Sequence, residues 1–194
     1  MAWNNRTMAP KPKPSKREAI LRAMLDIVVE RGFHDAPMSL LSQRSGASAG
    51  IIYHYFSSKE EIIEALYQQI SALKSEAFLA DFDPAKDPGQ VFVQLFLNLY
   101  AFYRKHQREM RFYELCSQAG FACAEQKKPK DPRSVAFAQH FSGSSQGGVL
   151  KEWPINVLQE MTLGLVERLA DQPKPLPQPL LREIAESIWQ SIKA

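Results

Sequence analysis

The sequence contains little that a secreted, membrane-spanning or disulfide-stabilised protein needs. Only two of its 194 residues are cysteines, which is too few for a disulfide scaffold and fits a reducing compartment. No run approaches about 18 consecutive apolar residues, so no membrane span is expected. Residues 1–20 lack the apolar core of a signal peptide, and we therefore expect a cytoplasmic location.

The reactive side chains form no recognisable catalytic or metal-binding set. The histidines form no metal-ligand cluster with the cysteines, and neither a nucleophile–base set nor a phosphate-binding loop is visible. We therefore expect no metal, no cofactor and no enzymatic activity. Cys116 and Cys123 are separated by about 10 Å if one helix carries both, which is too far for a disulfide unless the chain breaks at Gly120. Redox sensing is a minor alternative.

The net charge of +3 is unevenly distributed along the chain. Residues 1–59 carry nine Lys or Arg against four Asp or Glu, whereas the remaining 135 residues carry fifteen against seventeen. A basic end on a slightly acidic body is typical of a chain that offers that end to a polyphosphate. A basic tail that only aids solubility is the alternative.

Hydrophobic periodicity predicts helices throughout the chain, with no competing β pattern and no internal repeat. Residues 1–14 are expected to be disordered because prolines alternate with lysines there and no apolar residue recurs. The remainder reads as an all-α protein with about nine helices. The predicted helices span residues 16–31, 37–45, 49–55, 58–79, 91–106, 108–119, 133–142, 154–169 and 180–192.

Capping signals define the first helices. Ser15 and Glu18 have the spacing of a capping box, and Gly32 is suited to end the helix that they begin. Gly46 is a turn residue, because glycine adopts positive φ without strain. Ser48 can cap the short helix that follows, and Ser58-Lys-Glu-Glu61 forms a second capping box. These signals predict a helix, a tight turn and a second helix within residues 37–55.

A helix–turn–helix of this kind places its second helix in the major groove of DNA. Ile52 and Phe56 are predicted to pack on Leu41 and Ala47, which leaves the other face of helix 49–55 toward solvent. Small residues at its start allow close approach to the groove, and Tyr53 and His54 can reach phosphates or base edges. The expected DNA contacts are Lys16, Ser39, Arg44, Ser48, Ala49, Gly50, Tyr53, His54 and Lys59.

Each of these residues also has a simpler interpretation. Tyr53 or Tyr55 could be core aromatics that only pack, and His54 could be an inert surface histidine. Gly46 alone is a weak signal. The pattern is specific because several features occur together at fixed spacing: a cap, a leucine, a glycine, a serine, three aromatic residues and a capped helix that begins with a lysine.

The segment from Gly32-Phe33 through Leu41-Ser-Gln-Arg-Ser-Gly-Ala-Ser-Ala-Gly-Ile-Ile-Tyr-His-Tyr-Phe-Ser-Ser-Lys-Glu-Glu-Ile62 resembles the N-terminal domain of the tetracycline-repressor (TetR) family of bacterial transcription regulators. The resemblance covers residues 16–66. Ser42 and Ser45 stand where the family has small alanines. Pro37 stands where a phosphate-contacting Ser or Thr is common, so that contact is not carried over.

The resemblance implies an N-terminal three-helix DNA-binding domain with a helix-turn-helix, followed by a larger helical ligand-binding and dimerisation domain. The domains expected are a disordered basic arm (1–14), the helix-turn-helix domain (15–57) and the effector-binding and dimerisation domain (58–194). A homodimer would pair two helices from each subunit. Stripes that only close the core of the monomer are the alternative. The expected interface residues are Leu158, Met161, Gly164, Leu165, Leu181, Ile184 and Ile188.

The aromatic middle of the chain is expected to hold an effector pocket. Eleven Phe and six Tyr suit a concave apolar site for a flat or hydrophobic ligand. For any single residue the alternative, plain core packing, is the commoner outcome. The candidates are Phe96, Tyr100, Tyr103, Phe112, Tyr113, Cys116, Phe121, Phe137, Phe141, Trp153 and Met161.

The sequence therefore predicts a homodimeric repressor without a membrane segment, which binds a double-stranded DNA operator and is released by a small hydrophobic or aromatic effector. Two other classes stay open. One is a small helical enzyme or ligand-binding protein that uses the aromatic pocket. The other is an adaptor whose basic end binds a protein partner. Steep salt dependence of binding would distinguish DNA from a protein partner.

Overall fold

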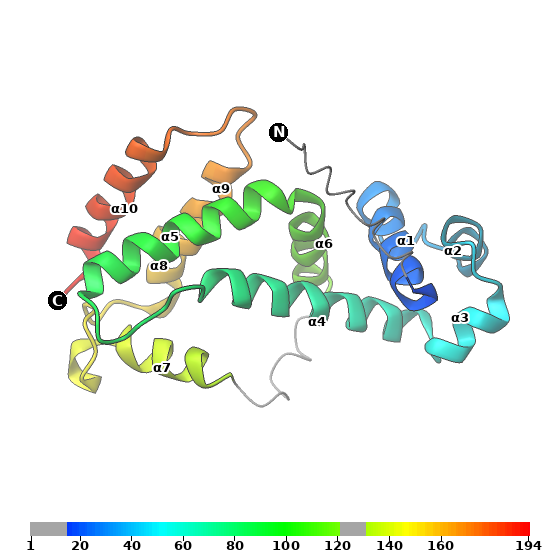
Figure 1. The fold of residues 1–194 in the computed structure, drawn as a ribbon, viewed down its shortest axis with the longest axis horizontal. Helices are drawn as coiled ribbons and strands as arrows, with labels where there is room; N and C mark the ends of the chain where they lie inside the picture. Colours follow the sequence, from blue (N-terminus) through cyan, green and yellow to red (C-terminus); the bar gives the residue numbers. More distant parts are fainter. Residues whose placement is uncertain (1–14, 121–130) are drawn as a thin grey trace, which may run out of the picture. The chain divides into compact units, whose positions relative to one another are not determined.

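The computed structural model describes residues 15–120 and 131–194, and the predicted arm (1–14), Phe121 and Cys123 lie outside this range. In the described residues the fold is all-α, as predicted, with isolated bridges but no strand (Figure 1). The helices are α1 (Lys16–Arg31), α2 (Met38–Ser45), α3 (Ala49–Tyr55), α4 (Lys59–Phe78), α5 (Pro88–Lys105), α6 (Gln107–Gln118), α7 (Pro132–His140), α8 (Ile155–Gln159), α9 (Leu165–Ala170) and α10 (Gln178–Ile192).

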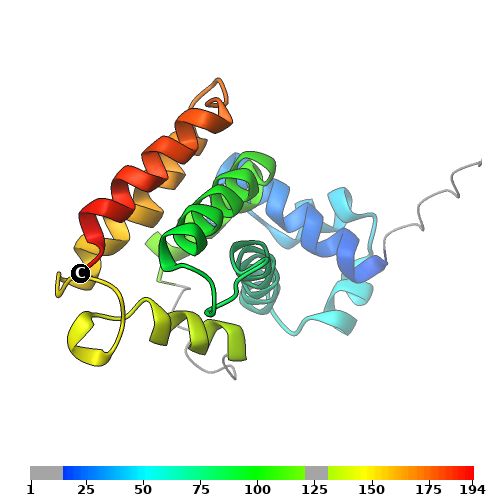
Figure 2. The ribbon, with the colours of Figure 1, turned by 60° about the vertical axis from the view of Figure 1, so that its left-hand side comes forward.

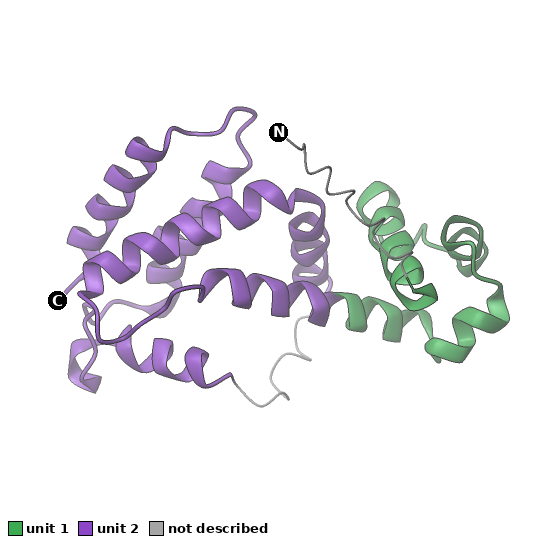
Figure 3. Ribbon diagram, viewed as in Figure 1, with its two compact units in different colours: residues 1–66 green, residues 67–194 purple. Residues whose placement is uncertain are grey.

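The chain divides into two compact units, and the division falls inside α4 (Figure 3). The described part of the first unit is residues 15–66, and the second unit begins at Tyr67. The sequence predicted a boundary at residues 57 and 58. The first eight residues of α4 belong to the first unit instead, and Ile62, Ile63 and Leu66 among them are buried. None of the described helices is both long and apolar enough to cross a bilayer.

In the first unit, α1 packs against α2 and α3. The predicted capping box is present at the start of α1: Glu18 N–H donates to Ser15 Oγ (3.2 Å), and Ser15 N–H donates to Glu18 Oε2 (2.7 Å). Gly32 ends α1 with φ of 79°, a conformation that glycine adopts without strain. The resulting core contains the apolar stripe of α1 with Leu41 and Ile52, all fully buried.

In the second unit, α5 packs against both α9 and α10 (Figures 1 and 2). Its buried face carries Phe92, Phe96, Leu99 and Tyr103, which explains why this helix is the most aromatic of the chain. The helical stretch from α8 to α9 is continuous but contains one turn of π-helix, η3 (Glu160–Gly164). Such turns are rare and are frequently found at functional sites. The sequence gives no signal for it.

The apolar stripes predicted for a dimer interface are only partly at the surface. Leu158, Leu181 and Ile188 are buried in the core that α5 shares with α9 and α10. The burial of these three side chains within one chain fits the alternative, in which the stripes close the core of the monomer. Met161, Leu165 and Ile184 pack at the edge of that core and remain partly exposed, and Gly164 is also half-buried.

Candidate DNA interface and effector cavity

The turn between α2 and α3 is shaped by glycine and by two serines. Gly46 has φ of 62° and ψ of 24°, the left-handed conformation predicted for it. Ser42 Oγ donates to the Ala47 carbonyl (2.7 Å), and Ala47 N–H donates to Ser45 Oγ (3.3 Å). The serines that replace alanine therefore satisfy backbone groups across the turn, a role that the sequence analysis missed.

Helix α3 presents one face to the core and the other to solvent. Ser48 Oγ accepts from Ile51 N–H (3.4 Å) as the predicted N-cap. Ile52 and Phe56 are buried, as predicted, whereas Ala49, Gly50 and His54 are exposed. Tyr53 is 55% exposed, so the interpretation of Tyr53 as a core aromatic is wrong. Ile51 and Tyr55 are also exposed and extend the face beyond the residues predicted.

The cations predicted to contact phosphate have partners within the free chain. Lys16 Nζ donates to the Gly46 carbonyl (3.0 Å), and Arg44 forms an ion pair with Glu30 (2.6 Å). Lys59 Nζ donates to the Phe33 carbonyl. These contacts brace the helix-turn-helix, and all three side chains remain exposed or half-buried. Contact of these three cations with DNA therefore stays a prediction. To bind a phosphate, each would have to give up its present partner in the chain.

The start of α4 is capped, but the Glu61 carboxylate pairs with a different serine from the one predicted. Glu61 N–H donates to Ser58 Oγ (3.2 Å), which is the predicted half of the capping box. The Glu61 carboxylate accepts from the hydroxyl (2.7 Å) and the N–H (2.6 Å) of Ser57 rather than from Ser58. These hydrogen bonds lower the pKa of Glu61. Together these hydrogen bonds hold the segment that links α3 to α4.

The second unit contains an apolar cavity of about 190 Å³. Phe78 of α4, Phe96 of α5, Phe137 of α7 and Phe141, which follows α7, line it. Three of these four, Phe96, Phe137 and Phe141, are among the residues predicted for the effector pocket. Ile155 lines the cavity and is 69% exposed, which places it at the rim. The lining is predominantly apolar, which suits a hydrophobic ligand.

The other residues predicted for the pocket do not line this cavity. Phe112 and Cys116 are fully buried core residues, and burial raises the pKa of the Cys116 thiol to about 12. Tyr100 has a positioning role, because its hydroxyl accepts from Leu176 N–H (2.9 Å) before α10. The remaining residues also pack elsewhere: Tyr113 stacks on Tyr67, Lys151 lies over Trp153, and Met161 packs against the core.

Tyr103 lines a different and larger cavity of about 560 Å³ whose walls are polar and charged. Burial and the nearby charge of Glu167 raise the pKa of the Tyr103 phenol. Burial, followed by the charge of Glu114, raises the pKa of Glu167. In the described residues no group of three or more His, Cys, Asp or Glu side chains has the arrangement of a metal site.

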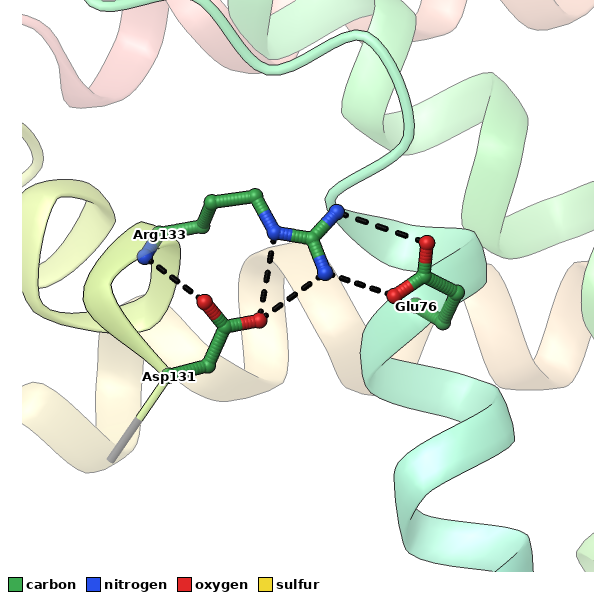
Figure 4. Close-up of polar contacts among 3 residues, drawn as sticks. All are labelled: Glu76, Asp131 and Arg133. Carbon is green, nitrogen blue, oxygen red and sulfur yellow. Dashed lines mark hydrogen bonds and ion pairs between the residues drawn. The ribbon is translucent and has the colours of Figure 1, made fainter. Parts of the chain in front are cut away.

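An ion-pair network ties the start of α7 to α4 (Figure 4). Arg133 reaches Glu76 Oε2 (2.6 Å) and Asp131 Oδ2 (2.9 Å) with the same guanidinium nitrogen. Hydrogen bonds from Arg133 lower the pKa values of both carboxyl groups. Two residues beyond Glu76, Phe78 packs edge-on against Phe137 of α7 (5.1 Å between ring centres, 77°). The network therefore holds together two walls of the apolar cavity.

Comparisons with known proteins agree with the geometry of the first unit. Residues 20–66 match the model of "Bacterial regulatory proteins, tetR family". The first unit is therefore similar to the DNA-binding domain of this family. The transcriptional regulator BetI of Klebsiella pneumoniae is 37% identical over 67 residues, and this match covers 34% of each chain. Like other BetI matches, it spans only about a third of the relative's length.

Other likenesses extend over more than nine-tenths of the chain. An uncharacterized HTH-type transcriptional regulator of Haemophilus influenzae is 24% identical over 188 residues, covering 93% of this chain and 97% of that regulator. The crystal structure of a TetR family regulator from Marinobacter aquaeolei has a TM-score of 0.81 at 18% identity, covering 92% and 95% of the two chains. At that identity the likeness establishes the fold. The named relatives and the matched structure are transcription regulators.

Proposed function

We propose that the chain is a ligand-responsive repressor that binds a double-stranded DNA operator as a homodimer in the cytoplasm. Its effector is a small hydrophobic molecule that enters the apolar cavity of the second unit. The observation that carries the proposal is the exposed face of α3, a capped helix held after a left-handed glycine turn, with Tyr53 and His54 toward solvent. A helix presented in this way can enter the major groove.

The proposed DNA contacts are the exposed side chains of α3 together with cations around it. Ala49 and Gly50 leave the start of the helix without bulk, which permits close approach to base edges. Lys16 and Arg44 can exchange their present partners for phosphates, because both hydrogen bonds are exposed to solvent. Lys59 can do the same from a half-buried position. Ser39 and Ser48 are exposed and can donate hydrogen bonds to the same backbone.

Helix α4 is the proposed route from effector to DNA. Its first residue, Lys59, donates a hydrogen bond to the Phe33 carbonyl in the first unit. Its last residue, Phe78, lines the apolar cavity. A ligand that displaces Phe78 would therefore act on the helix that carries Lys59. A change in the tilt of α4 would alter the spacing between the α3 helices of the two subunits. A coupling of about 1–3 kcal/mol is enough for substantial release.

The proposed homodimer uses surface residues of α9, η3 and α10. Met161, Gly164, Leu165 and Ile184 remain from the predicted interface. Leu180 is exposed one helical turn before Ile184 and extends the same apolar patch. Two-fold symmetry would place the recognition helices on half-sites about 34–36 Å apart, or a multiple of that spacing.

The test begins with selection of a duplex from random-sequence DNA by the full-length protein. Its affinity is then measured by fluorescence anisotropy over a range of salt concentrations. A pseudo-palindromic duplex and a linear, steep fall of log affinity with log salt are expected. Recovery of no preferred sequence, or binding that does not weaken with salt, would contradict the proposal. Competition with an unrelated duplex of equal length controls for non-specific binding.

A further inference from the structure

The apolar cavity restricts the charge of its ligand. Among the described residues that line it, none carries a charged side chain. An ionised ligand would lose its hydration there without gaining an opposite charge. This separates the cavity from the larger one around Tyr103, where Arg111, Glu160 and Arg168 form part of the wall. The apolar cavity therefore selects a neutral molecule.

Two polar side chains at the cavity, Gln159 and Thr162, define what such a molecule can hydrogen-bond. The Thr162 hydroxyl donates to the Leu158 carbonyl (2.6 Å), so only its acceptor capacity is left. No described residue makes a hydrogen bond to the Gln159 amide group, which offers both a donor and an acceptor. A single hydroxyl on the ligand could be satisfied by either residue.

The volume and the walls restrict the ligand's size and shape. A dry cavity of about 150 Å³ accommodates benzene, so about 190 Å³ has room for one substituted ring. Phe137 packs edge-on against Phe78 and lies 5.1 Å from Phe141, ring centre to ring centre. Aromatic pairs in such arrangements gain stabilisation beyond the area that they bury. A flat ring therefore fits these walls better than an aliphatic chain of equal size.

The backbone at the cavity is also unusual. Thr162 and Leu163 belong to the π-helical turn η3, and both line the cavity. Insertion of a π turn changes which side chains a helix directs to its packed face, and such turns are frequently found at functional sites. The π turn thus brings Thr162, a side chain that can hydrogen-bond, into the wall of an otherwise apolar space.

We propose that this cavity binds a neutral, single-ring aromatic molecule with one hydroxyl group, of which phenol is the simplest example. The ring would lie among Phe78, Phe137 and Phe141, and the hydroxyl would hydrogen-bond to Gln159 or Thr162. The proposal rests on the proposed function, because it assigns the chemical class of the effector.

The first test compares ligands of equal size on the full-length protein. Phenol and 1-hexanol have the same number of heavy atoms and differ in shape, whereas benzyl alcohol and benzoate differ in charge. Titration calorimetry and saturation-transfer NMR would measure binding. Phenol is expected to bind at least about tenfold more tightly than 1-hexanol, and benzyl alcohol to bind more tightly than benzoate by a similar factor. Equal binding within either pair would overturn the proposal.

Variants assign the binding to this cavity. Val166→Phe fills it, because Val166 is a buried lining residue, and should abolish phenol binding. Val135→Phe, at an exposed position of α7 outside the cavity, is the control. Gln159→Leu should weaken phenol binding about two- to tenfold and leave toluene binding unchanged, whereas Gln190→Leu, on the exposed face of α10, should alter neither. Unchanged phenol binding in Val166→Phe would overturn the assignment.

A variant that enlarges the cavity guards against misfolding in Val166→Phe. Phe137 is only half-buried, so Phe137→Ala is the gentler truncation. It should weaken phenol binding and add binding of 1-naphthol, a two-ring phenol that the wild-type cavity is expected to exclude. A partly unfolded protein also binds naphthalene compounds, so the gain is specific evidence for the site when the near-ultraviolet circular dichroism of Phe137→Ala matches that of wild type. Naphthol binding that is equal in both proteins would contradict the proposal.

The same ligands, added to the complex of the protein with the selected DNA duplex, distinguish the proposed function from the proposed ligand class. Phenol that binds the cavity and lowers DNA affinity supports both. Phenol that binds without changing DNA affinity would overturn the effector role and support the ligand class. Sequence-specific DNA binding by a protein that binds none of the single-ring ligands would overturn the ligand class and leave the DNA-binding function intact.

Discussion

The ammonium group of Lys59 donates a hydrogen bond to the backbone carbonyl of Phe33, and this contact joins the start of α4 to the turn that follows α1. One residue therefore braces the helix-turn-helix in the free chain and lies where a phosphate is expected in the complex. Because the side chain is half-buried, its loss must affect stability as well as DNA affinity. The two effects can be measured separately.

Lys59→Met keeps the aliphatic stem and removes the charge. It should lower the free energy of unfolding by about 1 kcal/mol, the usual net contribution of one hydrogen bond. It should also weaken binding to all duplexes alike, and reduce the slope of log affinity against log salt by about 1 for each Lys59 that contacts a phosphate. Thermal unfolding and anisotropy measure the two effects. The control is Lys86→Met, which removes an exposed cation of the second unit. A salt slope of Lys59→Met that equals that of wild type would show that Lys59 does not contact phosphate.

The Arg133 network predicts a dependence of stability on pH. In the folded chain the pKa of Glu76 lies below its ordinary value of 4.5, because Arg133 hydrogen-bonds to the carboxylate and carries the opposite charge. A carboxyl group whose pKa is lowered by folding stabilises the fold fully above its ordinary pKa, and loses that contribution as pH falls through the folded value. The melting temperature of wild type should therefore fall from about pH 4.5 downward.

Glu76→Gln removes this titration, so its melting temperature should lie below that of wild type at neutral pH and converge with it in acid. Circular dichroism melts at several pH values would measure the difference. Glu186→Gln, at an exposed position of α10, is the matched control. A constant difference between Glu76→Gln and wild type at every pH would mean that the ion pair makes no pH-dependent contribution.

Cys116 should be chemically inert in the folded protein. Its thiol is fully buried, and burial raises its pKa from 9.0 to about 12, which leaves roughly a thousandfold fewer thiolates at pH 8 than an ordinary cysteine has. In a Cys123→Ser background, reaction with a disulfide reagent should be slower by that factor or more before denaturation than after it. Comparable rates in both states would show that Cys116 is accessible, and would restore redox sensing as a hypothesis.

The proposed dimer depends on an apolar patch of α10. Leu180 is 41% exposed, and Ile184 lies one turn further along at the edge of the core. Leu180→Glu should shift the protein from dimer to monomer in sedimentation equilibrium, because two carboxylates would be brought together without partners. Leu73→Glu, at a similarly exposed apolar position of α4, should leave the dimer intact. A dimer of unchanged stability in Leu180→Glu would place the interface elsewhere.

The sequence predicts the first unit well because its signals are local. Ser15 and Glu18, Gly46 and Ser48 each act within one turn of the chain, so their caps and turn follow from spacing alone. The buried face of α3 also follows, since Ile52 and Phe56 are four residues apart and only one arrangement buries both. The ends of α1 and α3 were predicted to the residue.

The second unit is predicted less well because its details depend on neighbours that are distant in sequence. Periodicity indicates that Phe96 and Phe112 are both on apolar faces, but it cannot tell that one lines a cavity and the other packs in the core. In the same way Leu158 and Leu181 were assigned to a dimer interface, whereas α5 covers them within the chain. The π turn at Glu160–Gly164 has no sequence signal, so Thr162 could not be assigned to the cavity.

The most direct test of the account concerns Tyr53, which is 55% exposed and has no part in the core. Anisotropy titrations would compare wild type, Tyr53→Ala and the control Leu73→Ala on the selected duplex and on an unrelated duplex. Tyr53→Ala should lose about 1–3 kcal/mol of binding free energy on the selected duplex, lose less on the unrelated one, and melt at the wild-type temperature. Full retention of affinity and sequence preference by Tyr53→Ala would contradict the claim that the exposed face of α3 contacts DNA.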